Sequence, residues 1–146
     1  MGLLLSAFRK IVPAHQSMQS LNWDRHRFNG GELLNKCLGI IGLGNVGHRV
    51  ARYAKAFDMK VQAFDPYLAD EVFERHGVQK VDWITLLNTS DVITFHVPLN
   101  DETRGMISEM EIERMKPGVI LLNTARGGVI HLSLIHISEP TRQEAI

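Results

Sequence analysis

The sequence predicts an α/β fold: a doubly wound parallel sheet in a three-layer αβα arrangement, incomplete at its C-terminal side. Short apolar runs alternate along the chain with segments of helical periodicity, as strands and crossover helices do in such a sheet. A glycine-rich turn separates the first of these strands from the helix after it. The length of 146 residues leaves room for one ordinary domain.

Strands and helices are expected to alternate from residue 37 onward. Asp82 is a helix-capping residue, and Ser108 and Glu111 fit a capping box at the start of the last helix. The first helix after the glycine turn is expected to place one set of apolar residues on a single face: Val46, Val50, Tyr53, Ala54 and Phe57. The expected strands are 37–41, 60–64, 78–81, 91–97 and 119–123, and the expected helices are 45–57, 69–76, 82–87 and 108–115.

The N-terminal segment is expected to be a helix followed by a linker. Apolar residues recur at loose helical spacing from Leu3 to Met18, which predicts one helix. A surface segment then closes on a double glycine, Gly30 and Gly31. Residues 1–31 are therefore interpreted as an element that joins two domains.

Composition limits the classes of partner. Lysine plus arginine and aspartate plus glutamate number 16 each, so no net charge attracts nucleic acid or an anionic membrane. No run approaches the roughly 18 apolar residues of a membrane span. The single cysteine, Cys37, opens an apolar run and suits a buried thiol in a reducing compartment. We expect a cytoplasmic protein with no nucleic-acid partner, no membrane partner and no metal site.

The turn Gly42-Leu43-Gly44-Asn45-Val46-Gly47 fits the G-x-G-x-x-G fingerprint of Rossmann-type dinucleotide-binding domains. Gly42 permits a tight turn, Gly44 lets the backbone approach a pyrophosphate, and Gly47 allows helix and strand to pack closely. Free N–H groups and the positive dipole end of the helix at Asn45 would face the phosphates. A generic glycine turn is the alternative, but the position of the turn between a strand and a helix favours the dinucleotide site.

Asp65 follows the next expected strand, where a carboxylate can accept hydrogen bonds from the adenosine ribose hydroxyls. The same carboxylate would repel a 2′-phosphate, and no arginine or lysine lies between Asp65 and Asp70 to bind one. NAD is therefore favoured over NADP as the cofactor. Asp65 can also be read as a turn residue ahead of Pro66, and the two interpretations are compatible.

Three segments carry a resemblance to a known family. They are 38–47, which holds the glycine turn, 96–105, which begins His96-Val97-Pro98, and 115–130, which contains Asn123-Thr124-Ala125-Arg126-Gly127-Gly128. At these separations the chain resembles the D-isomer-specific 2-hydroxyacid dehydrogenases, a family that includes phosphoglycerate dehydrogenases and glyoxylate or hydroxypyruvate reductases. The resemblance extends from about Leu3 to Ile130.

The resemblance implies a role for each loop. Asn45 and Val46 would lie on the pyrophosphate of NAD, and Asp65 on the adenosine ribose. The loop after the fourth strand would line the adenosine side through His96, Val97 and Pro98, and Thr103 would close over the cofactor. Thr124, Ala125 and Arg126 would lie beside the nicotinamide. His96 also fits a second interpretation, a histidine satisfied locally at the end of a strand.

Arg126 is the candidate catalytic residue. A guanidinium can bind the carboxylate of a 2-oxo acid in bidentate fashion and stabilise negative charge that grows on the keto oxygen. The resemblance implies this role, and the alternative is a surface arginine in a glycine-rich turn. The family's proton donor, a histidine supported by a glutamate, lies well downstream of the arginine and has no counterpart in this sequence. We therefore expect this chain to be inactive by itself.

Residues 132–146 are expected to be a non-native tail, because 132–142 can be reverse-translated into a string that resembles a transposase-type sequencing adaptor. Residues 32–131 are then a partial NAD-binding Rossmann domain. The parent enzyme would be a homodimer that transfers hydride between NAD and a small D-2-hydroxy acid or its 2-oxo partner. Two alternatives remain open: an NAD-sensing, corepressor-like binding protein, and a related NAD enzyme that acts on formate or phosphite.

Overall fold

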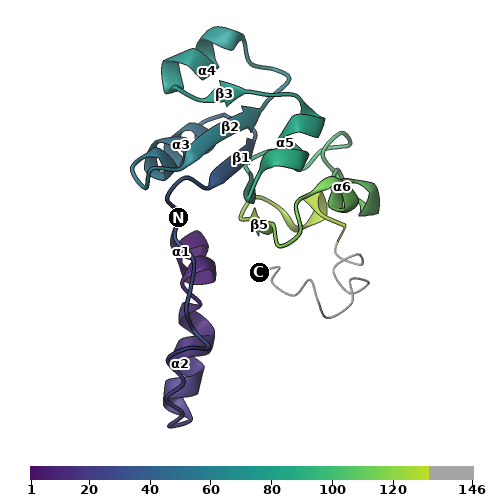
Figure 1. Ribbon diagram of the computed structural model, residues 1–146. Helices are drawn as coiled ribbons and strands as arrows, with labels where there is room; N and C mark the ends of the chain where they lie inside the picture. Colours follow the sequence, from purple (N-terminus) through teal and green to yellow (C-terminus); the bar gives the residue numbers. More distant parts are fainter. Residues whose placement is uncertain (132–146) are drawn as a thin grey trace.

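The computed structural model describes residues 1–131, and the expected non-native tail lies outside them. Five parallel strands form one sheet in the order β3-β2-β1-β4-β5, which confirms the doubly wound α/β fold (Figure 1). Ile41, Phe64 and Phe95 are aligned across three neighbouring strands, so their carboxyl ends meet at one edge. The strands are β1 (Cys37–Ile41), β2 (Lys60–Phe64), β3 (Gln79–Lys80), β4 (Val92–Phe95) and β5 (Ile120–Asn123).

Helices cover both faces of the sheet. The helices are α1 (Gly2–Phe8), α2 (Ile11–Gln19), α3 (Gly47–Lys55), α4 (Asp70–His76), α5 (Trp83–Thr89) and α6 (Glu109–Arg114), followed by the short 3₁₀ helix η1 (Gly127–Val129). Successive side chains of β1 point to opposite faces of the sheet. Leu38 and Ile40 pack in a cluster with residues of α1, α3 and α4, whereas Ile41 packs in a second cluster with residues of α5. The two buried clusters hold the carboxyl ends of the strands in place.

The apolar residues expected on one face of α3 are only partly buried. The helix packs on the sheet through Gly47, Ala51 and Ala54, whereas Tyr53 and Phe57 are exposed. Small residues are needed here because the helix approaches β1 closely, and a large apolar side chain would not fit between them. Of the apolar residues expected on that face, Ala54 is fully buried.

The expected single helix over Leu3–Met18 is wrong. The chain forms α1 and α2, and Lys10 between them adopts a left-handed conformation with φ of 51°. Pro13 explains the break, because a proline lacks an N–H and its ring clashes with the carbonyl four residues earlier, so it is tolerated only in the first turn of a helix. Starting α2 at Ile11 places Pro13 in that first turn.

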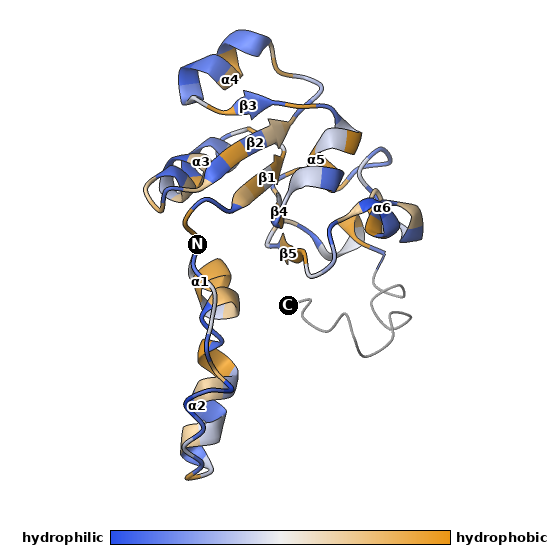
Figure 2. Cartoon of the chain, in the orientation of Figure 1, coloured by the Kyte–Doolittle hydropathy of each residue, from blue (hydrophilic) through white to orange (hydrophobic). Residues whose placement is uncertain are grey.

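The two N-terminal helices form an arm. Leu4 of α1 is buried in the domain core, but α2 has no buried residue and extends away from the sheet (Figures 1 and 2). The segment after α2 runs back beside it and returns at Gly31, whose N–H donates to the carbonyl of Phe8 at 2.9 Å. Throughout the described residues, each helix falls short of the length and apolar character required for a bilayer crossing.

The remaining elements match the expected order, with boundaries shifted by a few residues. Asp82 caps α5 by accepting a hydrogen bond from the N–H of Thr85 at 2.9 Å. The Glu111 carboxylate accepts from the N–H of Ser108 at 2.9 Å, as expected of the capping box at the start of α6. The strand expected at 78–81 is shorter than its apolar ends suggested, because β3 is an edge strand that pairs with β2 at Gln79 and Lys80.

Candidate cofactor site

The glycine turn between β1 and α3 has the geometry of a phosphate-binding turn. Gly42 adopts φ of 89°, a conformation that favours glycine, and a Cβ there would lie 2.7 Å from the carbonyl oxygen of His96. A Cβ on Gly47 would lie 2.1 Å from the carbonyl oxygen of Gly42, so α3 can approach β1 only with glycine at this position. Gly44, by contrast, faces open space.

Backbone donors at the start of α3 have no partner. In the part of the chain that the structure describes, the N–H groups of Gly44, Asn45 and Val46 donate to no acceptor. The positive end of the α3 dipole lies at the same place. Free donors beside the open space at Gly44 suit the oxygens of a diphosphate, so the backbone present here fits a dinucleotide.

Asp65 lies directly after β2, next to the glycine turn. One carboxylate oxygen accepts from the N–H of Leu43 at 3.0 Å, and the other accepts from the N–H of Tyr67 at 3.1 Å. These bonds fix the carboxylate beside the glycine turn and also make Asp65 a turn residue. A carboxylate accepts about four hydrogen bonds, so Asp65 retains capacity for ribose hydroxyls.

Sequence reasoning missed a contact that crosses this edge of the sheet. The hydroxyl of Tyr67, after β2, donates to the carboxylate of Glu102, in the loop after β4. The hydrogen bond to Glu102 raises the pKa of Tyr67, since it stabilises the protonated phenol, and the negative charges of Glu102 and Asp65 add to the effect. The position of Tyr67 two residues after Asp65 was the available signal, but its partner is 35 residues further along the chain.

His96 lies at the end of β4 and lines a pocket of about 350 Å³ at the carboxyl edge, between α1 and the ends of β4 and β5. Thr94, Thr124 and Val46 line the same pocket. Burial lowers the pKa of His96, and the positive charge of the amino terminus lowers it further. Its Nε2 lies 3.1 Å from the hydroxyl of Thr94, so His96 is satisfied locally while it faces the pocket.

The loop after β4 is organised by its own polar side chains. Thr103, expected to close over the cofactor, donates its hydroxyl proton to the carbonyl of Pro98. Asn100, which sequence reasoning missed, accepts from the N–H groups of Glu102 and Thr103 through its side-chain oxygen, at 3.1 and 2.9 Å. Thr103 therefore shapes the loop, and Val97 lies against the glycine turn near Gly42.

The loop after β5 presents Arg126 to solvent. The side chain of Asn123 binds both ends of this loop: its oxygen accepts from the N–H of Ala125 at 3.1 Å, and its nitrogen donates to the carbonyl of Arg126 at 2.8 Å. The guanidinium of Arg126 donates to the carbonyl of Ala125 at 2.9 Å and forms no ion pair within residues 1–131. It is free to bind an anion.

The structure thus brings the expected residues to one edge of the sheet, in the four loops that follow β2, β1, β4 and β5. The glycine turn contacts Asp65 on one side and the segment of His96 and Val97 on the other. Thr124 shares a pocket with His96, because Phe95 and Asn123 are aligned in β4 and β5. Arg126 lies in the same loop as Thr124, but none of its contacts reaches the glycine turn.

The fold and this turn together define a Rossmann-type dinucleotide-binding domain. The chain belongs to the D-isomer specific 2-hydroxyacid dehydrogenase family, whose NAD binding domain matches residues 1–136. The D-3-phosphoglycerate dehydrogenase of Archaeoglobus fulgidus is 49% identical over 129 residues, which cover 88% of this chain and 24% of that protein. The chain thus spans about a quarter of the length of that relative.

Solved structures give the same result. The D-lactate dehydrogenase from Aquifex aeolicus, complexed with NAD and lactic acid, matches with a TM-score of 0.87 and 35% identity, covering 93% of this chain and 41% of that one. An acyclic imino acid reductase in complex with NADPH and D-Arg matches with a TM-score of 0.84 and 32% identity, covering 97% and 46%. The family and its oxidoreductase class are therefore established.

Proposed function

We propose that this chain is the NAD-binding part of a dehydrogenase that interconverts a small D-2-hydroxy acid and its 2-oxo partner. The proposal rests on one observation: in the described residues, three partnerless N–H groups at residues 44–46 lie at the open turn around Gly44, next to the carboxylate of Asp65. The amides would hold the pyrophosphate, and Asp65 would accept hydrogen bonds from the adenosine ribose. The NAD complex of the related D-lactate dehydrogenase supports this assignment.

In the proposed reaction, bound NAD would supply the hydride acceptor or donor. Thr124 and Ala125 would lie beside the nicotinamide, and His96, Val97 and Pro98 would line the adenosine side. Arg126, exposed and free of an ion pair in the described residues, would bind the carboxylate of the acid in bidentate fashion. Such a contact would orient C2 of the acid and stabilise charge on its oxygen.

A binding measurement tests the cofactor assignment. We expect isothermal titration of this chain with NAD to give measurable heat, and Gly44→Val to weaken NAD binding by at least about tenfold, because the new side chain would occupy the space needed by the phosphates. A Cβ at Gly44 meets no protein atom within 4 Å, so the thermal midpoint should stay close to that of the wild type. Equal NAD affinity in the two proteins would contradict the proposal.

A turnover measurement tests whether this chain, in addition to binding NAD, can reduce an acid. Proton transfer to the keto oxygen requires a positioned acid, whereas the printed hydrogen bond of the Arg126 guanidinium goes to the backbone carbonyl of Ala125. We therefore propose that this chain binds NAD without reducing an acid. NADH consumption should stay at background with glyoxylate or hydroxypyruvate, and appreciable consumption would show that a catalytic acid is present after all.

A further inference from the structure

The bond between Tyr67 and Glu102 spans the crevice in which the cofactor is proposed to bind. In the sheet, β1 lies between β2 and β4, so the loops after β2 and β4 stand on either side of the glycine turn. Tyr67 belongs to the first of these loops and Glu102 to the second. Their hydrogen bond therefore crosses above the carboxyl end of β1, on the side where Asp65 lies.

Two carboxylates lie at this end of the crevice without a compensating cation. Asp65 accepts the N–H of Tyr67, and Glu102 accepts its hydroxyl proton, so one tyrosine separates the two groups. Neither carboxylate forms an ion pair in the part of the chain that the structure describes. Tyr67 itself is exposed, which leaves its ring available as a wall of the adenosine site.

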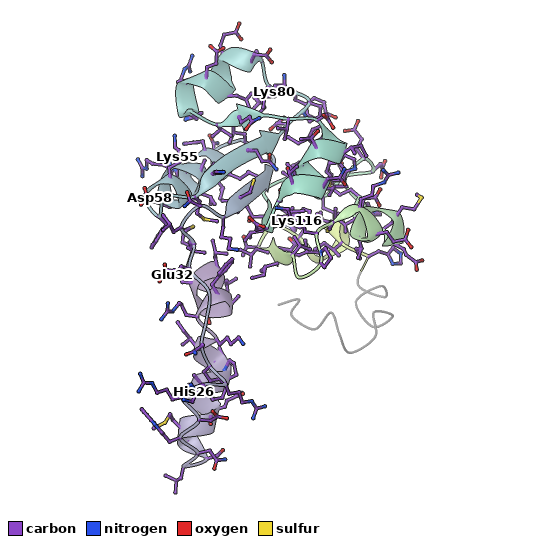
Figure 3. All side chains as sticks on the ribbon, in the orientation of Figure 1. His26, Glu32, Lys55, Asp58, Lys80 and Lys116 are labelled. Atoms are coloured by element: carbon purple, nitrogen blue, oxygen red, sulfur yellow. The ribbon has the colours of Figure 1, made fainter. Side chains whose placement is uncertain are left out.

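Two basic side chains close to these loops in the fold or the sequence, those of Lys80 and Arg104, bind or extend away from the two carboxylates. Lys80 of β3, labelled in Figure 3, pairs with Asp70 at the start of α4 and donates to the carbonyl of Leu68 at 3.5 Å, so its charge is engaged there. Arg104, two residues after Glu102, extends toward the loop after β5, where its guanidinium lies 3.8 Å from the position of a Cβ on Gly128. Within residues 1–131, neither Asp65 nor Glu102 has a cation paired to it, so an added phosphate would meet two uncompensated carboxylates.

We propose that Glu102, held in place by Tyr67, is a second determinant of cofactor choice that acts with Asp65 against the 2′-phosphate of NADP. This inference rests on the proposed NAD site. The fold alone does not decide the choice, since the related imino acid reductase was solved with NADPH. A phosphate monoester carries nearly two negative charges at neutral pH, so it is repelled strongly by a fixed carboxylate, whereas the uncharged ribose hydroxyls of NAD are not.

The test compares the ratio of the dissociation constants for NADP and NAD in four forms of this chain: wild type, Glu102→Gln, Tyr67→Phe and Glu113→Gln. Removing the charge of Glu102 should lower the ratio by roughly fivefold, chiefly through tighter NADP binding. Tyr67→Phe leaves the charge but frees the side chain, so a smaller decrease is expected. Glu113 is exposed on α6, and Glu113→Gln changes the net charge equally, so it should leave the ratio unchanged.

Ionic strength adds an independent readout. The difference between the wild type and Glu102→Gln should shrink between about 0.05 M and about 1 M NaCl, because salt screens exposed charges. An unchanged ratio in Glu102→Gln, with NAD binding intact, would overturn this inference and leave the proposed function standing. A wild-type chain that binds neither nucleotide would overturn both.

Discussion

At the scale of single residues, Gly47 matters both to the candidate site and to the stability of the fold, because each depends on the absence of a Cβ at this position. A Cβ there would lie 2.1 Å from the carbonyl oxygen of Gly42, and backbone cannot yield as a side chain can. We expect Gly47→Ala to lower the free energy of unfolding by about 2 to 3 kcal/mol, the range of overpacking substitutions. Urea unfolding measures the change.

Gly127→Ala is the matched control for that substitution, because a Cβ at Gly127 meets no atom within 4 Å and its φ lies outside the left-handed region. Its unfolding free energy should stay within about 0.5 kcal/mol of the wild type, as for most surface changes. If the two alanine variants were equally stable, the close approach of α3 to the turn would be refuted.

The pKa of Tyr67 offers a direct measure of its bond to Glu102. The bond stabilises the protonated phenol, so Glu102→Gln should lower the Tyr67 pKa toward its ordinary value. Ultraviolet titration of the phenolate reports it, with Tyr53→Phe as the common background so that only Tyr67 is observed. Identical titration curves for the two proteins would mean that the hydroxyl does not bind Glu102 in solution.

At the scale of elements, Asp91 joins three strands at the amino edge of the sheet. Its carboxylate accepts from the N–H of Cys37 at 2.7 Å, at the start of β1, and from Lys116 at 3.0 Å, ahead of β5; Lys116 is labelled in Figure 3. Burial alone would raise the Asp91 pKa, but the bonds from Cys37 and Lys116 outweigh it and lower the pKa below its ordinary value.

Asp91→Ala should therefore destabilise the fold by about 2 kcal/mol, because it leaves the N–H of Cys37 without its partner. Asp91→Asn keeps an acceptor for that N–H and should cost less. The pKa of Asp91 is lower in the folded than in the unfolded protein. The ionised carboxylate therefore stabilises the fold above the unfolded pKa of about 4, and this stabilisation is lost as the pH falls through the folded pKa. The gap between wild type and Asp91→Asn, measured by urea unfolding, should close below about pH 4; a gap that widened there would contradict this sign.

Element order could be read from the sequence because strands and crossover helices have different apolar periods. The errors have local physical causes. Pro13 is tolerated only in the first turn of a helix, so the N-terminal segment divides into α1 and α2, and α3 packs on the sheet through Ala51 and Ala54 rather than through its large apolar residues. A polar cluster was also missed: the buried amide of Gln62 in β2 donates to the hydroxyls of Thr89 and Ser90 at the C-terminal end of α5, which no linear pattern reveals.

At the scale of the whole molecule, some features of the candidate site could be predicted from the sequence and others could not. The glycine turn and Asp65 are adjacent to strands, so their place at the carboxyl edge follows from the order of elements. The Tyr67–Glu102 bond and the loop contacts of Asn100 and Asn123 depend on how separate loops fold, and their partners had to be located in three dimensions.

The arm is the feature of the molecule that bears on assembly. The segment that follows α2 and runs back beside it adds two exposed apolar residues to the arm, Leu21 and Trp23, whose exposed fractions are 93% and 78%. Surfaces of this kind commonly mark contacts between proteins. Homodimer formation stays a prediction: we expect this chain to sediment as a dimer, and the double variant Leu21→Ser, Trp23→Ser to sediment as a monomer.

Met110→Ser serves as the control for the arm, since Met110 is also an exposed apolar residue but lies on α6. It should leave the sedimentation coefficient of the dimer unchanged. A monomeric wild type at high concentration, or a double variant that still sediments as a dimer, would remove the arm from the interface.

The glycine turn also sets a pattern of deuterium uptake within a few residues of chain. The amide of Gly42 is bonded to the carbonyl of Phe64 and that of Leu43 to Asp65, so both should exchange slowly with heavy water. The amides of Gly44, Asn45 and Val46 donate to no acceptor in the described residues, so they should exchange within the dead time of the experiment. Adding NAD should slow those three alone, so the boundary between fast and slow exchange would move along the backbone as the nucleotide binds.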